Sequence, residues 1–221
     1  MSTWTKASHN LYTHLMYFTE PTTMLTDYLM AVFTAFFAYR LFKANEGQLT
    51  RRYWAWASVS TVAASVFAGT YHGFQAILPA TAIFLLDKAS SLSMVLISYF
   101  IMLSTAAATT RGSMKTWIGR AACLQAIVFT GVVLYFHSYA YAIADYAIAL
   151  LVLLALSLSH RDRRVIPWFV AGVLLSIAAA VIQQSTIQFA SWFNHNDIYH
   201  VIQLGAFYTF YRGGLVSKDR R

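Results

Sequence analysis

The sequence predicts an all-α fold, a polytopic membrane protein in which seven transmembrane helices form one domain over residues 1–221. Of the 221 residues, 58% are hydrophobic and only 11% are charged, whereas soluble domains carry about 25% charged residues. The apolar residues also form runs long enough to cross the roughly 30 Å hydrocarbon core of a bilayer. Seven spans are predicted, near residues 22–42, 53–73, 83–109, 117–136, 139–159, 165–187 and 197–213.

The basic residues predict the orientation of these spans. Fourteen of the sixteen lysines and arginines lie in or beside the connections after the first, third and fifth spans, or in the C-terminal tail. Only Lys6 and Lys88 fall on the opposite side. By the positive-inside rule, we expect the N-terminus outside and the C-terminus in the cytoplasm, with the inner membrane as the location if the protein is bacterial. The net charge of +8 is thus assigned to topology, with membrane lipids and not nucleic acid as partners.

The acidic residues show the opposite bias. Five of the eight lie at or near predicted outer ends of spans. Asp27 and Asp145 lie one to two turns inside their spans, where an ionisable side chain is costly and usually faces a cavity or a partner. The five residues are Glu20, Asp27, Asp87, Asp145 and Asp197.

Residues 194–203, "NHNDIYHVIQ", concentrate polar side chains where the seventh span begins. His200 shares a helical face with Asn196 and Asp197, four and three residues earlier. This stretch has two interpretations. It can be a helix start, with Asn194 or Asn196 as the N-cap and His200 as an ordinary buried histidine, or it can be one wall of a functional site.

Two further residues favour a functional site. His72 lies twenty residues after Arg52, about 30 Å along a helix, and therefore near the outer edge. Asp87 begins the third span, so His72, Asp87 and His200 approach the same leaflet from three spans. We expect a polar cavity in the outer half, lined by these three residues together with Tyr71, Asp27 and Asp145.

This pattern resembles the CREST superfamily of seven-span membrane hydrolases, which includes alkaline ceramidases and adiponectin-receptor-like proteins. The family pattern has a histidine late in the second span, an aspartate in the third and a histidine pair four residues apart opening the seventh. His72, Asp87 and His200 match three of these positions. Asn196 replaces the first histidine of the pair, and Ala68 replaces a serine four residues before the second-span histidine.

The resemblance implies hydrolysis of an amide or ester bond of a membrane lipid by water activated on Zn²⁺. Zinc binds three protein ligands and keeps a fourth position for water, whose pKa it lowers to near 7. The predicted ligands are His72, His200 and His195, with His195 substituting for the missing histidine beside it. Asp87 is the predicted catalytic base, and Ser65 is a second, polar catalytic participant.

Three alternatives use the same residue types. A non-catalytic receptor, or a proton-coupled transporter or channel, would use embedded acids and histidines as a relay. A b-type haem could be held between His72 and His200. A retinal protein would need a lysine deep in its last span, and residues 197–213 contain none.

Overall fold

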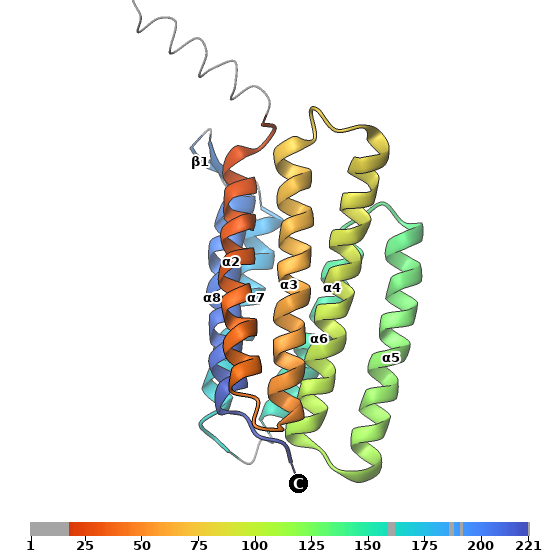
Figure 1. Ribbon diagram of the computed structural model, residues 1–221, viewed down its shortest axis with the longest axis vertical. Coiled ribbons are helices and arrows are strands. Elements are labelled where there is room, and N and C mark those ends of the chain that lie inside the picture. Colours follow the sequence, from red (N-terminus) through yellow and green to blue (C-terminus); the bar gives the residue numbers. More distant parts are fainter. Residues whose placement is uncertain (1–17, 159–161, 186–187, 191, 221) are drawn as a thin grey trace, which may run out of the picture.

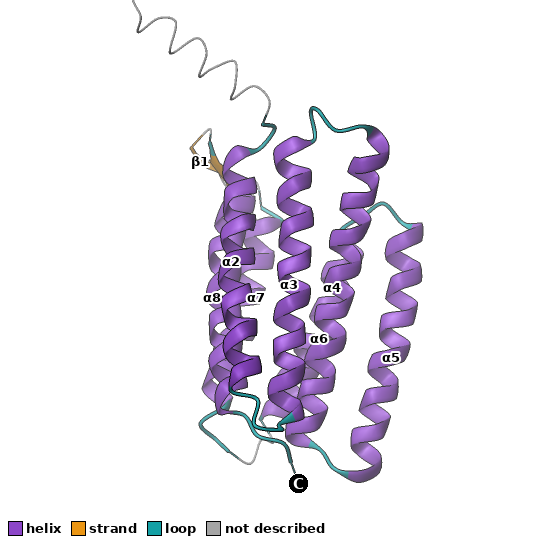
Figure 2. Ribbon diagram, in the orientation of Figure 1, coloured by secondary structure: helices purple, strands orange, loops and turns teal. Residues whose placement is uncertain are grey.

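The computed structural model describes residues 18–158, 162–185, 188–190 and 192–220, and these form an α-helical bundle (Figures 1 and 2). Successive helices run antiparallel, and the described C-terminal residues lie at one end of the bundle (Figure 1). A two-stranded antiparallel hairpin, β1 (Gln188–Ala190) and β2 (Phe193–Asn194), precedes the last helix. The helices are α2 (Pro21–Lys43), α3 (Leu49–Phe74), α4 (Ala80–Thr109), α5 (Gly112–Tyr135), α6 (Ala140–Ser157), α7 (Ile166–Gln183) and α8 (His195–Val216).

Five of these helices, α2, α4, α5, α6 and α7, are long and apolar enough to cross a membrane. This supports an integral membrane protein. The other two, α3 with 26 residues and α8 with 22, are long enough but less apolar. These two helices carry His72 and His200, which are among the polar residues that make them less apolar.

The helix boundaries agree with the predicted spans to within a few residues, and the differences have local causes. α4 begins at Ala80, three residues before the prediction, directly after Pro79. α7 ends at Gln183 rather than at 187 because the chain turns there toward the β-hairpin. The last residue of the predicted 139–159 span lies outside the described residues.

Glycines allow close contact between the helices that carry the site. A Cβ atom on Gly69 of α3 would lie 2.9 Å from Cβ of Asp27 on α2, so α2 approaches α3 where only glycine fits. On α8, Gly213 provides the same clearance for the ring of Phe169. Small residues at helix contacts are typical of membrane bundles, where packing replaces the hydrophobic effect.

Aromatic side chains fill the half of the bundle that lies toward the C-terminus. The Trp54 ring stacks between Phe169 and Phe210, with centroid distances of 5.4 and 5.5 Å. Phe37 stacks on Tyr211 at 4.7 Å. These contacts join α2, α3, α7 and α8 at the end of the bundle opposite the polar residues.

Hydrogen bonds join the segment after α8 to the start of α3. The Asp219 carboxylate accepts hydrogen bonds from the backbone N–H groups of Leu49 and Thr50, both at 2.8 Å, and from the Thr50 hydroxyl at 2.7 Å. The backbone N–H of Asp219 donates to Oε1 of Gln48 at 2.8 Å. Asp219 therefore satisfies the free N–H groups at the first turn of α3, as a helix cap does.

Candidate functional site

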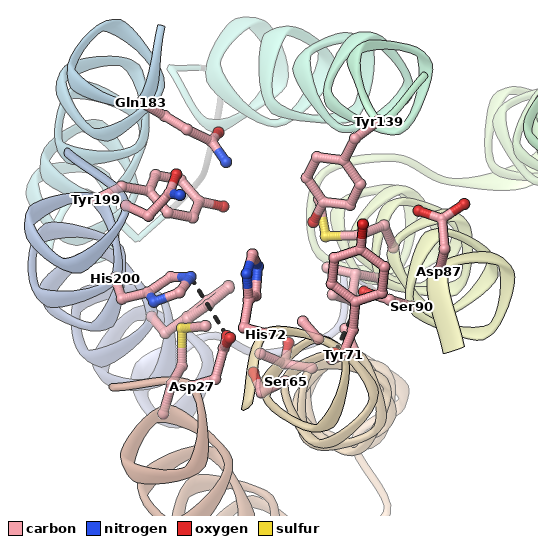
Figure 3. A pocket seen from close by; sticks show the side chains of 18 of the residues that line it. Asp27, Ser65, Tyr71, His72, Asp87, Ser90, Tyr139, Gln183, Tyr199 and His200 are labelled. Carbon is pink, nitrogen blue, oxygen red and sulfur yellow. Dashed lines mark hydrogen bonds and ion pairs between the residues drawn. The ribbon is translucent and has the colours of Figure 1, made fainter. Parts of the chain in front are cut away.

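A cavity of about 370 Å³ opens among α2, α3, α4, α6, α7 and α8 at the end of the bundle remote from the C-terminus (Figure 3). Its deeper wall is apolar and includes Met30, Met94, Ile97 and Phe207. The polar residues that line it are Asp27, Thr61, Ser65, Tyr71, His72, Asp87, Ser90, His137, Tyr139, Gln183, Asn196, Tyr199 and His200.

The most deeply buried ionisable contact on this cavity joins Asp27 of α2 to His200 of α8. Nε2 of His200 lies 3.3 Å from Oδ1 of Asp27, and the two side chains are 7% and 1% exposed (Figure 3). A charged group so far from water is stable only with a partner. The sequence identified both residues but did not predict that they are partners.

The hydrogen bonds around His200 indicate which of its two ring nitrogens carries a proton. The Thr26 hydroxyl donates to the backbone oxygen of Thr23 at 2.9 Å and lies 2.8 Å from Nδ1 of His200. Because the hydroxyl proton is already used, we assign the N–H of that second bond to Nδ1. With one further proton placed between Nε2 of His200 and Oδ1 of Asp27, the pair is neutral overall whichever of the two atoms carries it.

The start of α8 is fixed by a capping box. The Asn194 side chain accepts from the N–H of Asn196 at 2.8 Å, and the Asp197 carboxylate accepts from the N–H of Asn194 at 2.7 Å. The same carboxylate accepts from the Thr23 hydroxyl on α2 at 3.0 Å. Of the two predicted N-caps, the structure therefore has Asn194, and Asp197 joins α8 to α2 one turn before His200.

His72, at the end of α3, forms a second carboxylate–imidazole pair. Its Nδ1 lies 2.8 Å from Oε2 of Glu20, the residue that precedes α2. The hydrogen bond from His72 lowers the pKa of Glu20 below its usual range, although burial opposes this effect. Backbone hydrogen bonds from Thr19 to Gly73 and from Glu20 to His72, both 3.1 Å, hold the two segments together. Nε2 of His72 has no partner among the described contacts, and the ring stands in the cavity (Figure 3).

Asp87 lines the same cavity but contacts neither His72 nor His200. Its carboxylate lies 3.7 Å from Nζ of Lys88, and Figure 3 shows it on the far side of Tyr71 from the histidines. Lys88 in turn donates to the backbone oxygens of Val133 and Phe136, both at 2.8 Å. Asp87 thus belongs to a contact between α4 and the end of α5. The carboxylate beside a histidine, which was expected to be that of Asp87, is that of Asp27.

Asp145 does not line the cavity, contrary to the expectation from its depth. It is fully buried, and its Oδ1 accepts a 2.6 Å hydrogen bond from Nε2 of Gln125 on α5. Its helix, α6, turns this residue toward α5, so the carboxylate has a structural partner within the bundle.

Three buried polar atoms on the cavity wall have no hydrogen-bond partner among the described residues. They are Oδ2 of Asp27, Oγ of Ser65 and Oε1 of Gln183. Ser65 was predicted as a catalytic participant. Gln183 is the last residue of an apolar helix, and no pattern in the sequence predicted that it lines the cavity. Buried polar atoms normally have partners, so these three indicate that the cavity holds water or a polar ligand.

The predicted zinc ligands do not converge. His195 is in the first turn of α8 but does not line the cavity, while His72 and His200 are each engaged by a carboxylate. In the part of the chain that the structure describes, no group of three histidine, cysteine, aspartate or glutamate side chains is placed to hold a metal ion. The arrangement therefore does not fit zinc bound by His72, His195 and His200.

Residues 22–219 match a family of unknown function, DUF6962. The chain belongs to this family. The match begins at the second residue of α2, covers the other six described helices and ends at Asp219. No curated protein sequence and no solved structure matches the chain significantly.

Sequence reasoning named Glu20 and Asp27 among the outer acids, and Asp27 among the cavity residues, but paired neither carboxylate with a histidine. Glu20 and Asp27 are seven residues apart in "EPTTMLTDY", which places both on one face of a helix two turns apart. That spacing was a usable signal that the first span contributes two acids to one site.

The Glu20–His72 pair predicts a pH-dependent stability. A carboxylate whose pKa is lower in the folded than in the unfolded state stabilises the protein above its unfolded pKa, and this contribution is lost as the pH falls through the folded value. We expect Glu20→Gln to lower Tm by about 1–3 °C at pH 6, and the difference from the wild type to shrink below about pH 4.5. Thermal melts in detergent between pH 3 and pH 7 measure this. An unchanged difference in Tm between the variant and the wild type at pH 3 would contradict the assignment.

Metal analysis separates this geometry from a zinc site. Because the three histidines do not converge, we expect protein purified in micromolar zinc to hold far less than one zinc ion per chain by elemental analysis. One tightly held zinc ion per chain, lost in both His72→Ala and His195→Ala, would restore the three-histidine site.

Proposed function

We propose that the protein spans the membrane seven times, with its N-terminus outside and its C-terminus in the cytoplasm. The alternating direction of the helices and the lengths of α3 and α8 support seven crossings. The basic residues support the orientation, because those that follow α2, α4 and α8 lie at the end of the bundle opposite the cavity. The cavity then lies in the outer half of the membrane.

Reporter fusions test this topology. Green fluorescent protein fused after Arg221 should fluoresce, because it folds in the cytoplasm, and alkaline phosphatase at the same site should be inactive. A phosphatase inserted after Pro79, in the connection between α3 and α4, should be active. The reverse pattern at both positions would overturn the orientation.

We further propose that the cavity hydrolyses an amide or ester bond in a membrane amphiphile. The observation that carries this proposal is the presence of two carboxylate–imidazole pairs, Glu20–His72 and Asp27–His200, on one cavity. In the Glu20–His72 pair the carboxylate lies on Nδ1, and it orients the imidazole so that Nε2 can act as a general base. The reaction class agrees with the resemblance to the CREST superfamily, but no step described here passes through zinc.

The two pairs can divide the proton transfers of hydrolysis. His72 Nε2 removes a proton from water as the water oxygen bonds to the carbonyl carbon. The Asp27–His200 pair donates its shared proton to the leaving nitrogen or oxygen as the carbon–nitrogen or carbon–oxygen bond breaks. His72 then returns its proton through water to the Asp27–His200 pair. The sum is one water consumed, with a carboxylic acid and an amine or alcohol formed.

Activity assays on the reconstituted protein test this proposal. A panel of fluorogenic long-chain esters and amides should reveal turnover by the wild type. His72→Gln and Asp27→Asn should each lower kcat by about 100-fold or more, the usual contribution of a general acid or base. His195→Ala and Asp145→Asn are the matched controls, and both should retain the wild-type rate because neither residue lines the cavity.

Thermal melts accompany these assays, so that loss of activity is separated from unfolding. A wild-type protein that melts cooperatively but turns over no member of the panel would contradict hydrolysis. Equal loss of activity in Asp145→Asn and Asp27→Asn would contradict the assignment of the acid.

A proton-coupled carrier is the second candidate function. The observation that favours it is the buried contact between Asp27 and His200, two groups that could gain and release a proton as a ligand crosses the membrane. Proteoliposomes loaded with a pH-sensitive dye distinguish the two. Ligand-dependent proton uptake that Asp27→Asn abolishes would support the carrier, and its absence alongside turnover would support the hydrolase.

A further inference from the structure

The unpaired atoms of the cavity wall constrain what the cavity binds. Oδ2 of Asp27 and Oε1 of Gln183 are buried, and both can accept a hydrogen bond. Leaving buried acceptors unpaired is unfavourable. Ser65, with its free hydroxyl oxygen, lies deeper on the same wall. A ligand that satisfies these atoms must bring O–H or N–H donors.

The charges around the cavity exclude an anionic headgroup. No lysine or arginine is among the described residues that line it, whereas Asp27 and Asp87 are. The nearest lysine, Lys88, is held by two backbone carbonyls of the segment after α5 and is not part of the lining. A phosphate, sulfate or carboxylate placed here would find no lysine or arginine on the lining to pair with, because Lys88 already contacts Asp87 and His200 already contacts Asp27.

The shape of the cavity favours a single chain below this headgroup. Met30, Met94 and Phe207 line its deeper part. The cavity has a volume of about 370 Å³, whereas the neighbouring space that shares Thr61, Ile97 and Phe207 with it has only about 10 Å³ and leaves no room for a chain to continue. The polar groups thus lie at one end of the cavity, and the space at its apolar end suits one chain rather than two.

We propose that the cavity binds a single-chain amphiphile with a non-anionic, hydrogen-bond-donating headgroup, an amine or a hydroxyl. The headgroup lies between Asp27 and Gln183, and the chain lies against Met30, Met94 and Phe207. This assignment names the substrate class of the site under "Proposed function" and rests on that site. Binding and turnover are measured separately, however, so either proposal can fail alone.

Four probes with the same fourteen-carbon chain test the headgroup. They are tetradecylamine, 1,2-tetradecanediol, tetradecyltrimethylammonium and tetradecyl sulfate, none of which can be hydrolysed as an amide or carboxylic ester. The protein is held in nanodiscs of phosphatidylcholine, a lipid whose headgroup has no donors. Binding is followed as a saturable rise in Tm from tryptophan fluorescence.

We expect saturable stabilisation by the amine, the diol or both, and none by the other two probes. Binding of the amine alone would identify N–H as the donor, and binding of the diol alone would identify O–H. Binding of both would show that the cavity accepts either donor. The net charge of +8 would direct non-specific adsorption toward the sulfate. The strongest effect with sulfate, equal effects from amine and trimethylammonium, or no effect from any probe would overturn the proposal.

Substitutions at two neighbouring glutamines test where the headgroup binds. Gln183→Leu removes one unpaired acceptor and should weaken binding of the stabilising probe about tenfold. Gln184→Leu, the matched control, changes an exposed residue that does not line the cavity and should leave binding unchanged. Equal effects of the two substitutions would place the headgroup elsewhere and overturn the assignment.

Discussion

The contact between Asp27 and His200 is the constraint on which the polar end of the bundle depends. Within an apolar bundle, neither side chain can be buried at low cost unless the other lies beside it. α2 and α8, which begin 174 residues apart, must therefore meet at one depth and in one rotation. The Thr23–Asp197 hydrogen bond fixes the same two helices one turn away.

The remaining architecture keeps this contact in place. Gly69 lets α2 approach α3 closely, and the Glu20–His72 pair fastens the start of α2 to the end of α3. At the other end of the bundle, Asp219 ties the segment after α8 to the first turn of α3. Helices α2, α3 and α8 are thus joined at both ends, so the cavity between them has a defined shape and a fixed set of polar atoms.

The resemblance to the CREST superfamily and the observed geometry differ in one instructive respect. Both place a histidine at the end of the second helix and another in the last helix. In this chain each of those histidines faces a carboxylate from the segment around the start of α2, and Asn196 leaves α8 with one imidazole on the cavity, that of His200. In the proposed reaction, these helix positions would therefore act through two separate carboxylate–imidazole pairs rather than through one shared ion.

By itself, the sequence determined the helical class, the helix positions to within a few residues and the depth at which His72, Asp87 and His200 lie. These follow from the length and polarity of local segments, and depth accumulates by 1.5 Å per residue. The tertiary structure alone decided which side chains meet. Asp27 rather than Asp87 joins His200, Asp145 turns away to Gln125, and Gln183 reaches the cavity. A helix that is apolar on every side gives little indication of which face points inward. The rotation of such a helix is decided by contacts between residues distant in sequence, such as Gly69 against Asp27.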